Sequence, residues 1–182
     1  NSFNDLYTNT VQNTNVGIFF RSYSAPSPFT LADTDNDVGG SSAATGNTVI
    51  NYGGQTGSTS AANGIFANNQ WGLNVSYNTI NNNNGSGVNH VSTLRGIFLN
   101  SSSTSASVNC NHNNITIHSA ATTSQVTGIE NVFGSTPASN TVNINDNTIS
   151  GDYLTATSGV FYGIYSSSSP ATLNIQNNTI DP

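Results

Sequence analysis

One alternating pattern recurs along the chain and limits the folds that the chain can adopt. Apolar and polar residues alternate, and each copy closes on Asn-Thr-Ile or a close variant of it. The copies are Leu73–Ile80, Val108–Ile115, Val142–Ile149 and Leu173–Ile180, and similar closing residues are Val11 and Val49. Successive closing residues are 38, 31, 35, 34 and 31 positions apart. A repeat of this length predicts a solenoid, in which each repeat forms one coil and neighbouring coils share a core.

The apolar and polar positions of the pattern fall into separate columns when the copies are aligned. Since side chains along a strand alternate between two faces, the apolar columns are expected to point inward and the amides between them outward. The inward columns are Leu73, Val108, Val142, Leu173 and Val75, Cys110, Ile144, Ile175. Asn, Ser, Thr and Gly are poor helix formers, so short strands are expected instead. Equivalent strands of successive coils would pair in parallel about 4.8 Å apart.

An asparagine stands two residues before the closing Ile in every copy. The four are Asn78, Asn113, Asn147 and Asn178. Asparagine tolerates the left-handed conformation that a tight bend requires. Stacked asparagine side chains also hydrogen-bond to one another along a ladder. We therefore expect a structural ladder at a bend of each coil.

A second anchor, Gly-Ile, alternates with the first. It occurs at Gly17-Ile18, Gly64-Ile65, Gly96-Ile97, Gly128-Ile129 and Gly163-Ile164. Each coil then holds a Gly-Ile strand, an alternating strand and an Asn-Thr-Ile strand. The prediction is an all-β, right-handed parallel β-helix of about five coils of 31–38 residues. Residues 1–182 would be one solenoid segment of a longer protein, regular over 47–182, with an irregular first coil and a protruding loop within 1–46.

These Gly-Ile anchors and Asn-Asn-Thr-Ile closures resemble the right-handed parallel β-helix repeat proteins of the pectate-lyase-like superfamily. The serine runs at 101–103 and 166–169 also resemble repeats of large secreted surface proteins of Bacteroidetes-type bacteria. The resemblance implies a secreted protein at the cell surface. It further implies a structural or adhesive role in an extracellular or filament-forming protein.

The charge balance excludes several classes of partner. The chain has two Arg, no Lys and a net charge of −6. Binding to nucleic acid depends on Lys and Arg contacts with phosphate, so nucleic acid is not an expected partner. No stretch approaches the roughly 18 apolar residues of a membrane-spanning helix, so no membrane insertion is expected. The single cysteine, Cys110, excludes a disulfide framework and is expected to be an inert buried thiol.

Three aspartates, Asp33, Asp35 and Asp37, have the alternate spacing found at the start of many calcium loops. A hard cation takes several oxygen ligands, and alternate aspartates in an irregular turn can converge on one ion. The alternative is a solvated acidic turn, since the later Glu of such loops is missing. Calcium is the one cofactor that the sequence suggests.

The residue after each Gly-Ile forms another column. Its aromatic members are Phe19, Phe66, Phe98 and Tyr165, and Glu130 takes the fourth place. If the isoleucines point inward, this column points outward and could form an aromatic face for sugar rings or a partner protein. The alternative is that loops cover the rings or that the rings form a second buried layer.

Catalysis has little support in the sequence. A glycoside hydrolase needs clustered carboxylates, but Glu130 and Asp146 come from different strands of the repeat. His90, His112 and His118 lack metal-ligand or triad spacing. We therefore expect a non-catalytic structural or adhesive solenoid, with a carbohydrate-binding or polysaccharide-cleaving β-helix as the alternative. Its partners would be further coils or copies stacked end to end, or a glycan or protein of the cell surface.

Overall fold

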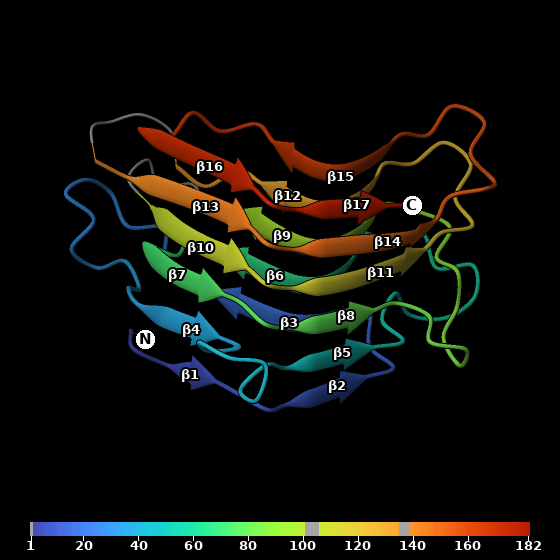
Figure 1. Cartoon of the computed structure of the whole chain (residues 1–182), viewed down its shortest axis with the longest axis horizontal. Coiled ribbons are helices and arrows are strands. Elements are labelled where there is room, and N and C mark those ends of the chain that lie inside the picture. Colours follow the sequence, from blue (N-terminus) through green and yellow to red (C-terminus); the bar gives the residue numbers. More distant parts are fainter. Residues whose placement is uncertain (1, 101–105, 135–138) are drawn as a thin grey trace.

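The chain forms a right-handed parallel β-solenoid in a computed structural model that describes residues 2–100, 106–134 and 139–182. In Figure 1 the chain crosses the front from left to right, returns behind and rises by one coil at each turn. Five coils are formed by three strands each, and two strands of a sixth follow. The all-β solenoid predicted from the repeat is thereby confirmed. In the described ranges there is no helix of the length and apolarity needed to cross a membrane.

Each coil contributes one strand to each of three parallel sheets. Sheet A contains β1 (Asp5–Leu6), β4 (Asn36–Val38), β7 (Gly72–Val75), β10 (Ser107–Asn111), β13 (Thr141–Asn145) and β16 (Thr172–Gln176). Sheet B contains β2 (Thr10–Gln12), β5 (Thr48–Ile50), β8 (Thr79–Asn81), β11 (Asn114–His118), β14 (Thr148–Asp152) and β17 (Thr179–Asp181). Sheet C contains β3 (Val16–Arg21), β6 (Ala62–Asn68), β9 (Leu94–Asn100), β12 (Val126–Asn131) and β15 (Phe161–Ser166). Sheets A and B form the front in Figure 1, and sheet C lies behind them.

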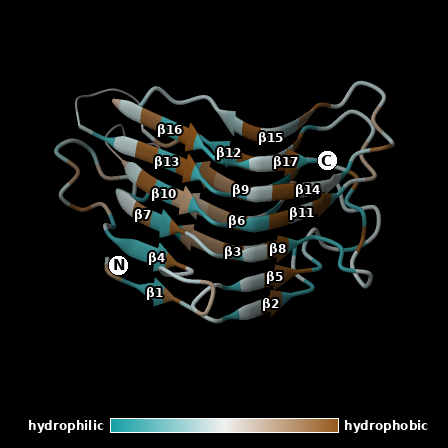
Figure 2. Cartoon of the chain, viewed as in Figure 1, coloured by the Kyte–Doolittle hydropathy of each residue, from teal (hydrophilic) through white to brown (hydrophobic). Residues whose placement is uncertain are grey.

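The core is a set of stacked apolar columns between the three sheets. In sheet A, Cys110 of β10 pairs with Ile144 of β13, and in sheet B, Ile115 of β11 pairs with Ile149 of β14. All four side chains are buried. Figure 2 shows hydrophobic and hydrophilic residues alternating along the strands. The inward columns predicted by alternation are therefore the columns that form the core.

The two sequence anchors meet inside the solenoid, across a coil boundary. A Cβ atom built on Gly96 of β9 would lie 2.5 Å from Cγ2 of Ile115, which closes the pattern of the next coil. It would also lie 2.6 Å from the carbonyl oxygen of Gly128. Gly64, Gly128 and Gly163 have the same relation to Ile80, Ile149 and Ile180. Glycine is therefore required in this column because a side chain would occupy the space of the next closing isoleucine.

A continuous asparagine ladder joins the six coils at the turn between sheets A and B. Its members are Asn9, Asn47, Asn78, Asn113, Asn147 and Asn178. In each of the first five, Nδ2 donates to the Oδ1 of the next asparagine at 2.9–3.0 Å. From Asn47 on, each Nδ2 also donates to a backbone carbonyl of the preceding coil. The ladder therefore uses both the N–H donors and the carbonyl acceptor of the side-chain amides to hold neighbouring coils in register.

The ladder asparagines do not adopt the left-handed conformation, contrary to the expectation from the sequence. The left-handed residues stand one position earlier, with φ of 60° at Tyr77, 55° at His112, 57° at Asp146 and 56° at Asn177. That residue makes the sharp bend, and its side chain is partly or fully exposed. The asparagine after the bend is thus free to direct its amide inward and along the stack.

The first 46 residues supply four strands, β1 to β4, and one long connection between β3 and β4. This connection contains Phe29, which has a φ of 65° and packs against Trp71 with ring centroids 4.7 Å apart. In Figure 1 it extends beyond the left edge of the sheets. Asp37 belongs to β4 rather than to the expected irregular calcium loop, because it pairs with Asp5 and Asn74 of the neighbouring strands.

Candidate functional site

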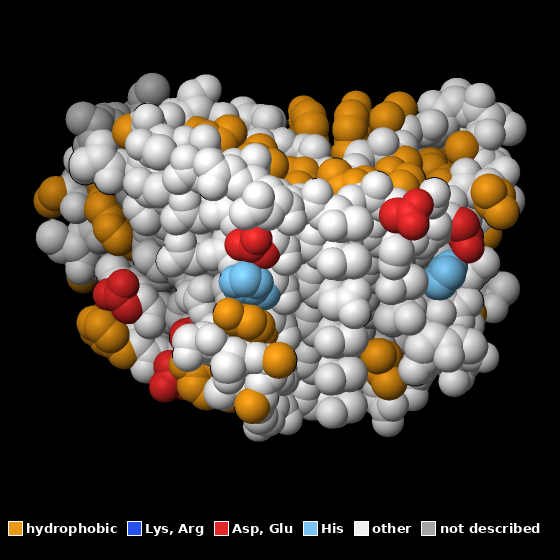
Figure 3. Space-filling model, viewed as in Figure 1, with side chains coloured by type: hydrophobic (Ala, Val, Ile, Leu, Met, Phe, Trp, Pro, Cys, Tyr) orange, Lys and Arg blue, Asp and Glu red, His pale blue; other side chains and the backbone are white. Residues whose placement is uncertain are grey.

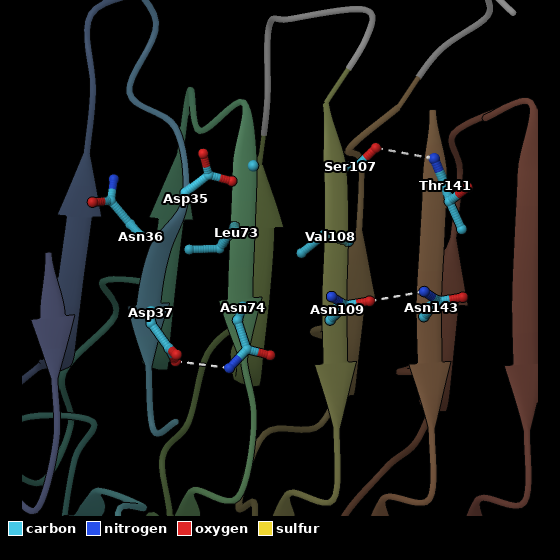
Figure 4. Close-up of a pocket in the computed structure, with 11 residues that line it drawn as sticks. Asp35, Asn36, Asp37, Leu73, Asn74, Ser107, Val108, Asn109, Thr141 and Asn143 are labelled. Carbon is cyan, nitrogen blue, oxygen red and sulfur yellow. Dashed lines mark hydrogen bonds between the residues drawn. The ribbon is translucent and has the colours of Figure 1, made fainter. Parts of the chain in front are cut away.

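A groove of about 440 Å³ crosses the outward face of sheet A. It spans four successive coils, from Asp35 just before β4 to Thr141 and Asn143 of β13. Its volume lies within the range of about 300–1,000 Å³ that is usual for small-molecule sites. Figure 4 shows the lining side chains projecting from neighbouring strands. The groove combines a volume that suits a small ligand with side chains from four coils, and we take it as the candidate site.

Two rows of side chains form the groove because residues two apart on a strand point to the same face. The first row is Asp35, Gly72, Ser107 and Thr141, and the second is Asp37, Asn74, Asn109 and Asn143. Asn36, Leu73 and Val108 also border it, although their side chains are buried in the core. Gly72 has no side chain, so the groove is open at that position of the first row.

Only part of the hydrogen-bonding capacity of the second row is used within the protein. Asn143 Nδ2 donates to Asn109 Oδ1 at 2.8 Å, and Asn174 Nδ2 donates to Asn143 Oδ1 at 2.7 Å. Asn74 turns away from Asn109, because its Nδ2 bonds Asp37 and the Gly40 carbonyl and its Oδ1 accepts from Ser76. Within the described part of the chain, Asn109 Nδ2 has no protein acceptor. Its two N–H groups thus remain available near the middle of the groove.

The charge in the groove is negative and lies at one end. Asp37 is held by Asn74, by the Gly40 amide and by the Tyr7 hydroxyl, which donates to Asp37 Oδ2 at 2.8 Å. This hydrogen bond to Asp37, with smaller effects of burial and of the nearby charges, raises the pKa of Tyr7 to about 12. Asp35 is exposed, and its carboxylate lies beside Gly72. Both arginines belong to strands of sheet C, in β3 and β9, so neither lines the groove.

The three aspartates proposed for calcium have different environments. Asp33 is buried and forms an isolated bridge with Gln70, Asp35 is exposed, and Asp37 is hydrogen-bonded in β4. Over residues 2–100, 106–134 and 139–182, no three His, Cys, Asp or Glu side chains are grouped to hold a metal ion. Calcium binding at Asp33, Asp35 and Asp37 stays a prediction of the sequence.

The aromatic column of sheet C is a stack in which most ring faces are covered. Phe66 stacks on Phe19 at 4.7 Å and on Phe98 at 5.1 Å between centroids, with interplanar angles of 12° and 14°. The Arg95 guanidinium covers Phe98, with Cζ 4.3 Å from the ring centroid. A sugar ring stacks on the face of an aromatic ring, and the faces of Phe66 are both occupied by its neighbours. Phe19, which is 53% exposed, ends the stack.

Glu130 interrupts this column and is only 7% exposed. Its carboxylate accepts hydrogen bonds from the Arg95 guanidinium and from Gln125 Nε2. Beyond it, Tyr165 stacks on Tyr162 at 4.9 Å rather than continuing the phenylalanine stack. Phe19, Phe66, Phe98 and Tyr165 thus lie on one outward face, but as two separate aromatic groups.

The remaining candidate residues lie apart from the groove. His112 stacks on Tyr77 at 4.6 Å, and His118 Nδ1 lies 2.7 Å from Asp152 Oδ2 on the face of sheet B. His90 is buried against the Gly53 carbonyl, and burial lowers its pKa. Cys110 is a free thiol in the core, and burial raises its pKa. In Figure 3, most of the front face is neither hydrophobic nor charged, with Asp, Glu and His in a few patches.

Asp35 and Asp37 of the groove were singled out in the sequence as possible calcium ligands, but Asn74, Asn109 and Asn143 were missed because the sequence presents them as ordinary outward amides. The pairing register of the strands in sheet A could have identified them, since it places Asn74, Asn109 and Asn143 in the same column as Asp37. No family model matches the chain, and neither a curated protein nor a solved structure matches it. The function is therefore argued from the geometry alone.

Proposed function

We propose that this β-solenoid is a non-catalytic structural segment, a rigid spacer that also presents surfaces for adhesion. The observation that supports the proposal is the unbroken register of its coils. The asparagine ladder, the apolar columns and the glycine column all continue from one coil to the next. Each coil is held to its neighbours by hydrogen bonds between buried asparagine side chains as well as by the core. Such a stack resists bending and stretching along its axis, which a spacer requires.

The setting that fits such a spacer is a large extracellular or filament-forming surface protein. The Gly-Ile anchors and Asn-Thr-Ile closures resemble pectate-lyase-like β-helix repeats and bacterial surface repeats, which supports this setting. The low charge and the amide-rich surface are consistent with it. In this proposal the chain needs no cofactor.

The partner at the end of the stack would be a further coil or a second copy. Leu173, Ile175 and Ile180 of the last coil are 40%, 44% and 46% exposed. Their counterparts one coil earlier, Val142, Ile144 and Ile149, are fully buried. Figure 3 shows hydrophobic side chains along this upper edge. Covering it would remove apolar surface from water, which favours association by about 25 cal/mol per Å².

Sedimentation velocity over a range of concentrations tests this end-to-end contact. We expect concentration-dependent association of the wild-type chain. Ile175→Asp should abolish it, because a carboxylate would have to be buried in the contact. Leu154→Asp is the control, since Leu154 is 90% exposed and lies outside the strands. A chain that stays monomeric at all concentrations, or equal effects of the two variants, would rule out association through this end.

A further inference from the structure

The groove on sheet A has a surface chemistry that the spacer function does not need. We propose that it binds a neutral, extended glycan that lies along the solenoid axis across β4, β7, β10 and β13. The inference goes beyond the proposed function and does not rest on it, because a solenoid that never associates end to end would still present this groove. It also assigns the glycan to sheet A rather than to the aromatic residues of sheet C.

Hydrogen-bonding capacity is the first support for a hydroxyl-rich ligand. Asn109 offers two N–H donors that no protein acceptor uses in the described residues, and Asn143 offers one. The Ser107 hydroxyl accepts from the Thr141 amide at 3.1 Å, so its own hydrogen remains free to donate. Asp35 supplies an exposed carboxylate acceptor at the end of the groove. Donors along the row and an acceptor at its end suit alternating ring hydroxyls and ether oxygens.

The spacing of these groups is the second support. Neighbouring strands of a sheet are about 4.8 Å apart, and the groove residues repeat at that interval over four strands. One sugar ring of an extended chain advances by close to this spacing. Successive rings would therefore meet equivalent side chains on successive coils. The volume of about 440 Å³ has room for a short run of such rings.

Charge selects between classes of glycan. Asp35 and Asp37 line the groove, and its described lining contains no Lys, Arg or His. A carboxylate or sulfate on the ligand would be repelled by these aspartates and would find no cation there. The net charge of −6 acts in the same direction at longer range. A glycan without ionised groups avoids this penalty.

An aromatic pair stands next to the groove. Trp71 precedes the groove residue Gly72, and its ring packs against Phe29 at 4.7 Å between centroids. The tilt between the two rings is 46°, so the pair is not a closed stack like that of Phe66. Trp71 is partly exposed and is the single tryptophan of the chain. We therefore expect its fluorescence to change when a ligand occupies the neighbouring groove.

The test titrates the purified chain with cellohexaose, mannohexaose and xylohexaose, and with hexagalacturonate as the acidic counterpart. Trp71 fluorescence and isothermal titration calorimetry are the two readouts. We expect saturable binding of at least one neutral hexasaccharide and at least tenfold weaker binding of hexagalacturonate. Absence of saturable binding for all three neutral probes, or tighter binding of hexagalacturonate, would overturn the proposal.

Two matched pairs of variants locate the site. Asn109→Asp keeps the size of the side chain but removes both donors, and we expect at least tenfold weaker binding. Its control is Asn114→Asp, an exposed asparagine on sheet B, which should stay within twofold of wild type. Thr141→Glu blocks the end of the groove, and Thr148→Glu on sheet B is its control. If Asn109→Asp does not fold, the comparison of Thr141→Glu with Thr148→Glu still tests whether the glycan binds in this groove. Equal affinities within the pairs would overturn the assignment to this groove.

Discussion

Asn113 and Asn109 are four residues apart in one coil, yet the fold gives their identical side chains opposite roles. Asn113 is 1% exposed and belongs to the ladder between sheets A and B, whereas Asn109 is exposed in the groove of sheet A. Asn113 stabilises the stack of coils, and Asn109 keeps donors for a ligand. The difference arises because Asn109 lies on the outward face of β10, whereas Asn113 lies in the turn after β10, directly after the left-handed His112.

The hydrogen-bond partners of the two amides make this difference concrete. Asn113 Nδ2 donates to the Val75 carbonyl and to Asn147 Oδ1, and Asn113 Oδ1 accepts from the backbone N–H and Nδ2 of Asn78. Asn109 has one protein partner for its amide, Asn143. Water can replace a partner of Asn109 but cannot reach the partners of Asn113. Removing the buried amide therefore takes away one hydrogen bond from each of these buried groups.

The largest effect that we predict is for Asn113→Ala. The substitution removes the hydrogen bonds that the Val75 carbonyl and the Asn78 backbone N–H make with the Asn113 side chain. It also removes one hydrogen bond each from Asn78 Nδ2 and Asn147 Oδ1, which keep other partners. A buried group left without its partner costs about 1–3 kcal/mol. We expect the free energy of unfolding to fall by roughly 3 kcal/mol or more. At about 2–4 °C per kcal/mol, this is a large drop in melting temperature by circular dichroism. Asn109→Ala, as the control, should cost about 0.5 kcal/mol or less because its site is exposed. Similar losses of unfolding free energy for the two variants would show that the buried ladder does not stabilise the stack more than the exposed row does.

An intermediate effect is predicted for Gly96→Ala. The added methyl group would collide with Ile115 and the Gly128 carbonyl of the next coil, both of which are held in the stack. Overpacking of this kind costs about 1–3 kcal/mol. Gly72→Ala is the matched change on the outside, where the nearest atom, 3.0 Å away, belongs to the exposed Asp35 carboxylate. Urea denaturation should therefore show a clearly smaller loss for Gly72→Ala than for Gly96→Ala, and the reverse order would contradict the proposed inter-coil contact.

The smallest effect on stability is predicted for Asn143→Ala, which removes two hydrogen bonds of the outward row. Because one bond is exposed and the other is only partly buried, water can replace the lost partners. We expect a change of about 0.5 kcal/mol or less in the free energy of unfolding, measured by urea denaturation. Asn147→Ala, in the buried ladder of the same coil, provides the contrast. A loss for Asn143→Ala as large as that for Asn147→Ala would mean that the outward row also holds the coils together.

Much of the fold could be predicted from periodicity. Alternation placed Val142 and Ile144 in the core, and the recurring Asn-Thr-Ile placed Asn147 in a column of asparagines. Two features escaped this reasoning. The left-handed residue is Asp146 rather than Asn147, and Gly128 contacts the closing isoleucine of the next coil, Ile149. Both depend on backbone direction at the turns, which a column alignment does not contain.

The candidate site was harder to predict because it is formed between coils. The sequence drew attention to Phe66 and Phe98, but the parallel stacking of their rings covers the faces that a sugar would need. It also placed Asp37 in a loop, whereas pairing with Asn74 puts it on a strand beside the groove. Ring stacking and strand pairing are tertiary contacts over about one coil of sequence, and no local pattern specifies them.

The sequence by itself determined that this protein is a stack of β coils, since the repeat fixes which side chains must be buried together. The tertiary structure decided which hydrogen-bonding groups of the outward residues are used within the protein and which remain free. Asn109 keeps free donors only because Asn74 bonds Asp37, the Gly40 carbonyl and Ser76 instead of it. Such a choice among hydrogen-bond partners depends on distances of a few ångströms across coils, and these distances are set only when the coils have stacked.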